Sequence, residues 1–151
     1  MVTSVVLLDA GPIGMATNPR PSPKNLACTE WLSRLVDQGV RVVIPEIADY
    51  EVRRELLRVN KVKGLIQLDQ LCELLEYLPI TTAAMRQAAQ FWAVARQHGQ
   101  PTAGDKTLDA DVILAGQVVT LDDPDVVVAT TNVGHLSRFV TARIWEDIVV
   151  D

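Results

Sequence analysis

Asp9 is the first of three acidic residues placed where a carboxylate can do chemistry. It ends the short apolar run 4–8 and is followed at once by the turn-forming residues 10–12. Ligands of open α/β sheets bind where the strands end, so an acid at that point is well placed for a reaction. The position equally suits a residue that caps the next helix, and both interpretations of Asp9 remain open.

Glu51 and Asp111 each lie on the apolar face of an expected helix. Glu51 comes one turn after Ile47, and Asp111 lies three residues after Leu108 and three before Leu114. A carboxylate on such a face is costly unless something pairs with it. Glu51 also fits a solvated helix face, and Asp111 also fits a partner for a core hydroxyl group.

Convergence of these three acids on one point would create a site for a divalent cation. Gathered carboxylates repel one another, and Mg²⁺ suits a site of few carboxylates and several waters. A metal ion held in this way activates water and stabilises charge on a phosphoryl group. Three roles remain open for Asp109: a cap at the start of its helix, a fourth metal ligand, or a group that supports the metal ligands. The polar run Thr130–Asn132 follows another expected strand. Its side chains either lie at the same edge of the sheet as Asp9 or belong to an ordinary turn.

The expected elements alternate between strands and helices. Short apolar runs predict strands at residues 4–9, 41–44, 78–80 and 126–130, with an edge strand at 143–145. Helical spacing predicts helices over 25–37, 46–60, 62–77, 82–98 and 108–119, with one short turn over 12–17. This alternation predicts an α/β fold with a parallel sheet covered on both faces, and we expect one domain over residues 1–151.

Composition narrows the function classes. The 151 residues are 48% hydrophobic and carry a net charge of −5, which argues against nucleic-acid binding through bulk positive charge but not against a nuclease. Cys28 and Cys72 have neither metal-site nor disulfide spacing, so we interpret them as reduced core thiols of a cytoplasmic protein. No apolar run approaches the roughly 20 residues of a membrane span, and no signal peptide is expected.

Two segments are candidates for the rim of the site. The main basic cluster consists of Arg53, Arg54, Arg58, Lys61 and Lys63. It suits a phosphate backbone, an acidic partner or simply a solvated helix face. The proline-rich segment 18–24 is interpreted either as a loop over the site or as a rigid connector.

The order of these motifs resembles the PIN domain, in particular the toxin nucleases of bacterial and archaeal toxin–antitoxin pairs. A strand ends in Asp9, Glu51 lies six residues after Pro45, Asp111 opens the run Asp-Val-Ile-Leu-Ala, and 130–132 read Thr-Thr-Asn. The resemblance covers nearly the whole chain. It implies a Rossmann-like α/β/α sandwich with four to five parallel strands.

The resemblance also implies an activity and a set of site residues. Asp9, Glu51 and Asp111 match the acidic metal ligands, Asn132 matches the fourth catalytic position, and Thr130 matches a hydroxyl that supports the first acid. The implied protein is a Mg²⁺- or Mn²⁺-dependent endoribonuclease whose partners are RNA, a cognate antitoxin and a second copy of itself.

This sequence departs from the family pattern at two places. Ala10 and Gly11 stand where the family commonly has Thr or Ser and then Asn or Ser, and Asn132 stands where many members have Asp. Asp109 is a hypothetical replacement for that missing charge. The departures favour a second hypothesis, a catalytically silent PIN-like module that binds RNA or protein. A phosphate-binding domain of another doubly wound fold is disfavoured, because no Gly-rich loop follows the first strand.

Overall fold

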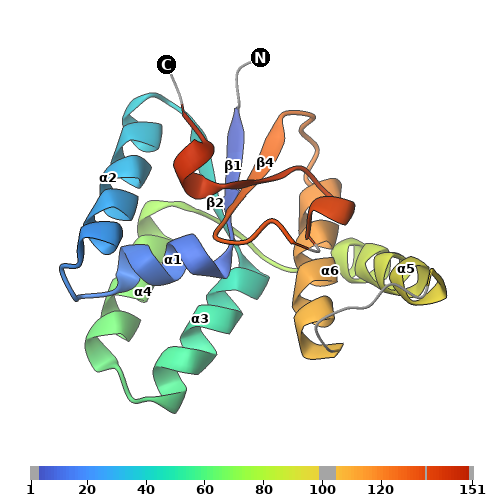
Figure 1. The fold of residues 1–151 in the computed structure, drawn as a ribbon, viewed down its shortest axis with the longest axis horizontal. Coiled ribbons are helices and arrows are strands. Elements are labelled where there is room, and N and C mark those ends of the chain that lie inside the picture. Colours follow the sequence, from blue (N-terminus) through green and yellow to red (C-terminus); the bar gives the residue numbers. More distant parts are fainter. Residues whose placement is uncertain (1–3, 99–104, 135, 150–151) are drawn as a thin grey trace.

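The computed structural model describes residues 4–98, 105–134 and 136–149. Its centre is a five-stranded sheet in the order β3-β2-β1-β4-β5, and every neighbouring pair of strands is parallel (Figure 1). The strands are β1 (Val5–Leu8), β2 (Arg41–Pro45), β3 (Glu76–Leu78), β4 (Val126–Thr130) and β5 (Ala142–Ile144). The predicted α/β fold with a parallel sheet is therefore confirmed.

The described residues also form six α-helices and two short 3-10 helices. The α-helices are α1 (Ala10–Thr17), α2 (Pro23–Asp37), α3 (Glu46–Arg58), α4 (Val62–Leu74), α5 (Thr82–Gln97) and α6 (Asp105–Thr120). The 3-10 helices are η1 (Leu136–Arg138) and η2 (Trp145–Asp147). None of the helices in the described part of the chain is long and apolar enough to span a membrane.

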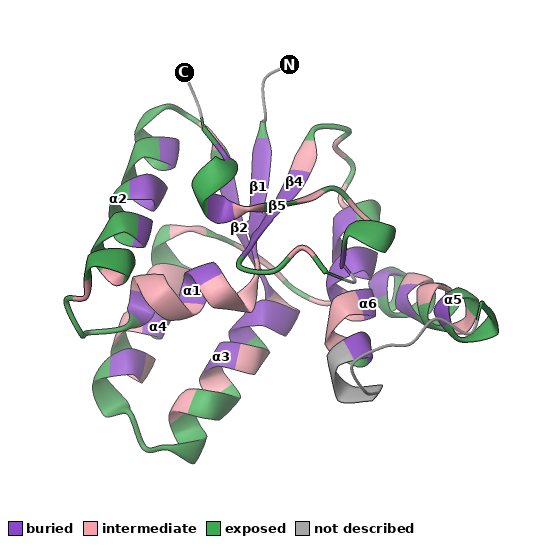
Figure 2. Cartoon of the chain, viewed as in Figure 1, coloured by how far each residue is buried: buried purple, intermediate pink, exposed green. Residues whose placement is uncertain are grey.

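Alternation along β1 divides the core into two layers. Val6 and Leu8 pack in the cluster that includes buried residues of α1, α2 and α4, whereas Val5 and Leu7 pack in the cluster that includes residues of α6. Successive strand residues point to opposite faces, so an entirely apolar strand serves both layers. Figure 2 shows the strands buried between these two groups of helices.

Several boundaries differ from the predicted ones. The turn expected at 12–17 is a complete helix, because Asp9 caps it from one residue before its start. The helix expected to reach residue 77 ends at Leu74, since Glu76–Leu78 pair with β2 and Arg41 donates a 2.7 Å hydrogen bond to Glu76. Gly39 ends α2 as predicted and adopts a φ of 79°, a conformation that glycine tolerates best.

Some large apolar side chains of the helices are exposed. Leu26 is 52% exposed on α2, and Met85 is 45% exposed on α5. Close packing of α5 on α6 depends instead on Gly116, where an added Cβ would lie 2.3 Å from the carbonyl oxygen of Ala84. The buried apolar faces of α2 and α5 therefore include fewer residues than helical spacing suggests.

The carboxyl ends of the strands form the edge that matters for function. In Figure 1, β1 runs toward the start of α1, α3 extends away from the end of β2, and the first turns of α6 lie at the same end of the sheet. Three separate connections therefore bring α1, α3 and α6 to one edge, as expected for a parallel α/β sheet.

Candidate active site at the carboxyl edge of the sheet

Asp9 is fixed from two sides. Its Oδ1 accepts a 2.8 Å hydrogen bond from the Ala10 N–H, and its Oδ2 accepts a 2.8 Å bond from Thr130 Oγ1. Thr130 ends β4, next to β1 in the sheet, and is 1% exposed. Asp9 is thus both the cap of α1 and a rigidly held carboxylate at the sheet edge, so its two interpretations are compatible.

Glu51 lies on α3 and is influenced by the other two acids. Burial raises the pKa of Glu51 to about 7, and the negative charges of Asp9 and Asp111 push in the same direction. The Arg54 guanidinium group opposes this shift. An acid with such neighbours retains its proton near neutral pH unless a cation offsets the repulsion.

Asp111 lies on α6 and belongs to the same electrostatic group. Burial raises the pKa of Asp111 to about 6, the charge of Asp9 contributes to the increase, and Arg138 of η1 opposes it. Asp9 therefore acts on acids from two helices that are distant in sequence. The structure brings together the three acids that the sequence analysis named.

A metal ion of the predicted kind fits the chemistry of these side chains. Three carboxylates offer hard oxygen ligands, and their mutual repulsion is what a divalent cation relieves. Among the described residues, no group of three His, Cys, Asp or Glu side chains is arranged to hold a metal ion directly. Mg²⁺ keeps several waters in protein sites, so it needs only one or two direct carboxylate ligands.

The space beside Gly11 is filled by Thr131. A Cβ added at residue 11 would lie 2.5 Å from Thr131 Cγ2 and 2.7 Å from Thr131 Oγ1. A larger residue at position 11 therefore fits only if the Thr131 side chain moves. A hydroxyl group from Thr131 stands beside the position where the family pattern has a polar side chain.

Asn132 is exposed and is joined to the site through its backbone. Its N–H donates a 3.2 Å hydrogen bond to Thr130 Oγ1, the hydroxyl that holds Asp9. Its side-chain oxygen lies near Gly134, 3.0 Å from the position of a Cβ at that residue. The catalytic role predicted for Asn132 remains a prediction.

Asp109 occupies a different environment from Asp111. It is exposed and lines a hollow of about 380 Å³ between α5 and α6, together with Met85, Trp92 and Val112. Since residues two apart on a helix point in different directions, Asp109 and Asp111 do not share a face. This position gives no support to Asp109 as a fourth metal ligand, which stays a hypothesis.

A second hollow adjoins Glu51. It has a volume of about 480 Å³ and lies between α1 and α3. Its lining includes Asn18 and Pro19, so the start of the proline-rich segment does form a rim beside a candidate site residue. Lys61, from the predicted basic cluster, lines the same hollow.

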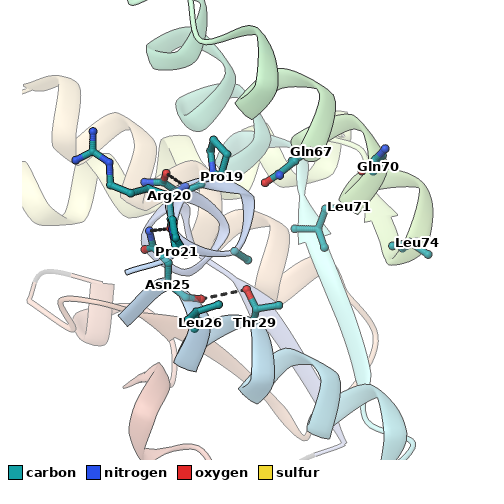
Figure 3. A pocket seen from close by; sticks show the side chains of 12 residues that line it. Pro19, Arg20, Pro21, Asn25, Leu26, Thr29, Gln67, Gln70, Leu71 and Leu74 are labelled. Atoms are coloured by element: carbon teal, nitrogen blue, oxygen red, sulfur yellow. Dashed lines mark hydrogen bonds between the residues drawn. The ribbon is translucent and has the colours of Figure 1, made fainter. Parts of the chain in front are cut away.

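The rest of the proline-rich segment borders a separate pocket. Pro19, Arg20 and Pro21 line this pocket of about 380 Å³ together with residues of α4 (Figure 3). Pro23 already belongs to α2, whose N-cap Ser22 accepts a hydrogen bond from the Asn25 N–H. The segment is therefore both a rim and a short connector.

The predicted basic cluster divides into groups with different surroundings. Arg53 turns toward the protein, where it contacts Asp49 at 3.0 Å and Asp69 at 2.8 Å. Arg58 pairs with the exposed Glu55 at 2.7 Å. The cluster is thus not a continuous basic surface, because Arg53 and Arg58 point to different sides of α3.

Gln117 and Asp49 are polar residues of the interior that the sequence analysis did not identify. Gln117 is 1% exposed and Asp49 is 8% exposed. Gln117 stands in an otherwise apolar stretch of α6, and that isolated polarity was the available clue. Asp49 precedes Glu51 by two residues and looks like an ordinary charge near a helix start, so nothing in the sequence distinguishes it.

Comparison with known proteins gives a likeness of fold. No protein-family model and no curated protein matches the sequence. Among solved structures, VapBC2 from Rickettsia felis bound to a DNA fragment from its promoter contains a chain 15% identical, with a TM-score of 0.70 over 93% of this chain and 98% of that one.

Two further structures extend this likeness. A chain of FitAcB from Neisseria gonorrhoeae is 22% identical, with a TM-score of 0.68 over 95% of this chain and 99% of that one. A chain of VapBC-1 from nontypeable Haemophilus influenzae is 16% identical, with a TM-score of 0.67 over the same shares. With its parallel sheet in the order β3-β2-β1-β4-β5, the chain shares the fold of these chains, which is the PIN-like α/β fold expected from its sequence.

Proposed function

We propose that this protein is a metal-dependent endoribonuclease that hydrolyses RNA phosphodiester bonds and serves as the toxin of a toxin–antitoxin pair. The observation that carries the proposal is the grouping of Asp9, Glu51 and Asp111, whose charges act on one another at the carboxyl edge of the sheet. Acids with pKa values raised in this way are concentrated at functional sites.

The residues of the proposed site have different roles. Asp9, Glu51 and Asp111 would hold Mg²⁺ or Mn²⁺, which supplies activation of water and neutralisation of phosphate charge. Thr130 holds Asp9 in one orientation through its 2.8 Å hydrogen bond. Asn132, whose backbone bonds the same hydroxyl, presents its amide at the exposed end of β4. Water attacks phosphorus, the bond to the 3′ oxygen breaks, and that oxygen takes up a proton.

The proposed protein partner is an antitoxin that covers the site. Support comes from the similar solved structures, which are complexes of the VapBC kind. The hollow of about 480 Å³ beside Glu51 offers apolar surface from Val52, Leu56 and Val59 for such a partner. We further propose a cytoplasmic homodimer, and sedimentation of the purified protein tests its oligomeric state.

Cleavage of structured RNA by the purified protein tests the proposed activity. Wild type is compared with the Asp9→Asn, Asp111→Asn double variant in Mg²⁺, Mn²⁺ and EDTA. The matched control is Asp122→Asn, which removes an exposed acid from the turn before β4. We expect metal-dependent cleavage by wild type and control, and none by the double variant. Equal cleavage by the double variant would remove these acids from the mechanism.

A cellular experiment tests the toxin role. Induced expression should arrest growth, Asp9→Ala should relieve the arrest, and co-expression of a small protein encoded next to the gene should do the same. Growth that is unaffected by wild-type expression, although the purified protein cleaves RNA, would separate the nuclease activity from the toxin role.

The second candidate function is a silent PIN-like module that binds RNA or protein. It is favoured by Ala10, Gly11 and Asn132, which replace two polar side chains and a charge of the family pattern. Calorimetric titration with Mn²⁺ distinguishes the two candidates. Binding that is lost in the double variant supports the nuclease, whereas a wild type that neither binds Mn²⁺ nor cleaves RNA supports the silent module.

A further inference from the structure

Gln117 is a buried amide that bonds two elements besides its own helix. Its Oε1 accepts a 3.2 Å hydrogen bond from the Ile47 N–H of α3, and its Nε2 donates a 2.8 Å bond to the Leu78 carbonyl oxygen of β3. The backbone partners fix the orientation of the amide, because an N–H requires an acceptor and a carbonyl requires a donor. With 1% exposure, Gln117 makes these bonds out of contact with water.

The bond to Ile47 supplies the N-terminal capping hydrogen bond that the N-cap residue of α3 does not make. The first N–H groups of a helix have no partner within the helix, and a side chain at the N-cap usually accepts a hydrogen bond from one of them. The N-cap of α3 is Pro45, which makes no side-chain capping bond. Gln117 therefore caps α3 from another helix.

This cap directly joins the helices that carry two of the three acids. Glu51 lies one turn after Ile47 on α3, and Asp111 lies six residues before Gln117 on α6. Ile47 and Leu114 also share one core cluster, so the amide bond lies within a packed contact. Any movement of the first turn of α3 relative to α6 must break or stretch the buried Ile47–Gln117 bond.

We propose that Gln117 is a positioning residue that sets the separation of the Glu51 and Asp111 carboxylates and thereby the affinity of the site for a divalent cation. This inference rests on the proposed function for its connection to metal binding. It acts through two helices and places no atom of Gln117 on the metal ion or substrate. Groups that hydrogen-bond a metal ligand directly change metal affinity by about 10- to 100-fold when replaced, and a residue that acts through the helices should have an effect at the lower end of that range.

The experiment compares Gln117→Met with Val118→Ala. Methionine has nearly the shape of glutamine and removes both hydrogen bonds, whereas Val118→Ala removes packing from the neighbouring buried residue of the same helix and core. Thermal unfolding of each variant measures the loss of stability. Titration of the folded proteins with Mn²⁺, well below their unfolding temperatures, measures affinity.

We expect Gln117→Met to lower Mn²⁺ affinity by about tenfold and Val118→Ala to leave it unchanged, even where both lose similar stability. Wild-type affinity in folded Gln117→Met, or an equal loss in Val118→Ala, would overturn the positioning role. If Gln117→Met does not fold, Gln117→Asn replaces it, because the shorter amide cannot span Ile47 and Leu78. For Gln117→Asn a loss of about threefold or more supports the role, and unchanged affinity overturns it.

A wild-type protein that fails to bind Mn²⁺ would leave the positioning role to a metal-free measurement, and if it also failed to cleave RNA the proposed function would be refuted. Crystal structures of wild type and of the folded amide variant, Gln117→Met or Gln117→Asn, then decide. Displacement of the first turn of α3 relative to α6 supports the role. An unchanged arrangement of α3, α6 and the two carboxylates overturns it.

Discussion

Asp49 and Glu51 lie two residues apart on α3 and have opposite surroundings. Asp49 is 8% exposed, accepts a 2.7 Å hydrogen bond from the Tyr77 hydroxyl and contacts Arg53 at 3.0 Å. Burial, together with the hydrogen bond to Asp49 and its negative charge, raises the pKa of Tyr77. For Glu51, burial and the negative charges of Asp9 and Asp111 raise the pKa to about 7, against the opposing effect of the Arg54 guanidinium group.

The difference shows that neighbours, not residue type or position along a helix, decide what a buried acid does. A carboxylate with a cation and a hydroxyl donor is balanced within the protein. Asp49 joins α3 to β3 through Tyr77, and its partner Arg53 joins α3 to α4 through Asp69. A carboxylate among other carboxylates leaves negative charge for an external cation to balance. We therefore assign Asp49 to structure and Glu51 to the proposed chemistry.

Replacement of Glu51 is the change with the largest expected effect. Glu51→Gln keeps the shape of the side chain and removes its charge, so we expect RNA cleavage to fall by about 100-fold or more while the protein stays folded. Initial rates at saturating Mg²⁺ and thermal unfolding measure the two outcomes. Wild-type rates in Glu51→Gln would contradict the contrast between the two acids, because Glu51 would then be no more involved in catalysis than Asp49.

Asp49→Ala should show the reverse pattern, with a loss of stability in place of a loss of activity. The change leaves Tyr77 and Arg53 without their shared partner, and breaking a buried pair is strongly destabilising. Since Arg53 is one-third exposed and retains Asp69, we expect a discounted loss of about 2 kcal/mol in the free energy of unfolding. Urea denaturation measures this loss, and Asp49→Asn, which can still accept from Tyr77, should lose less.

Cleavage by folded Asp49→Ala should stay within a few-fold of wild type. A 100-fold loss without unfolding would show that Asp49 belongs to the site as much as Glu51 does.

Asp9 combines both kinds of surroundings, which allows a sharper test. It faces the other acids as Glu51 does, and it accepts a hydrogen bond from Thr130 as Asp49 does from Tyr77. Thr130→Val removes that bond and keeps the shape, so Mn²⁺ affinity should fall by about tenfold. Thr130→Ser keeps the hydroxyl and should bind Mn²⁺ like wild type. Equal affinity of the valine and serine variants would assign the Thr130 hydroxyl to packing alone.

The sequence predicted the sheet, its parallel direction and the convergence of the three acids, because each follows from apolar periodicity and from the ends of strands. Asp9, Glu51 and Asp111 stand out as charges at apolar positions. Such features depend on residues close together in the chain, and strands in a parallel sheet all end at one edge.

The polar contacts between distant elements were not predictable in the same way. Asp49 meets Tyr77 28 residues later, and Ile47 meets Gln117 70 residues later. The close approach of Thr131 to Gly11 likewise depends on how β4 ends beside α1. Such contacts depend on the positions of whole elements, so local spacing carries no information about them.

The smallest expected effect is on the pH dependence of stability. The folded-state pKa values of Glu51 and Asp111, about 7 and about 6, lie above their ordinary values of 4.5 and 3.8. The folded protein therefore binds more protons than the unfolded chain in this range, so the two acids lower the stability of the metal-free protein as pH rises from about 4 to about 7. Partial exposure limits the contribution of Glu51 to about 1 kcal/mol.

Unfolding of metal-free wild type and Glu51→Gln by urea at pH 5 and pH 8 measures this contribution. The variant should lose less stability between the two pH values, and Asp122→Asn should behave like wild type. Excess Mn²⁺ should make wild type relatively more stable at pH 8, because a bound cation favours the ionised carboxylates. Identical pH dependence in wild type and Glu51→Gln would mean that Glu51 is as well balanced within the fold as Asp49, and the contrast between the two acids of α3 would disappear.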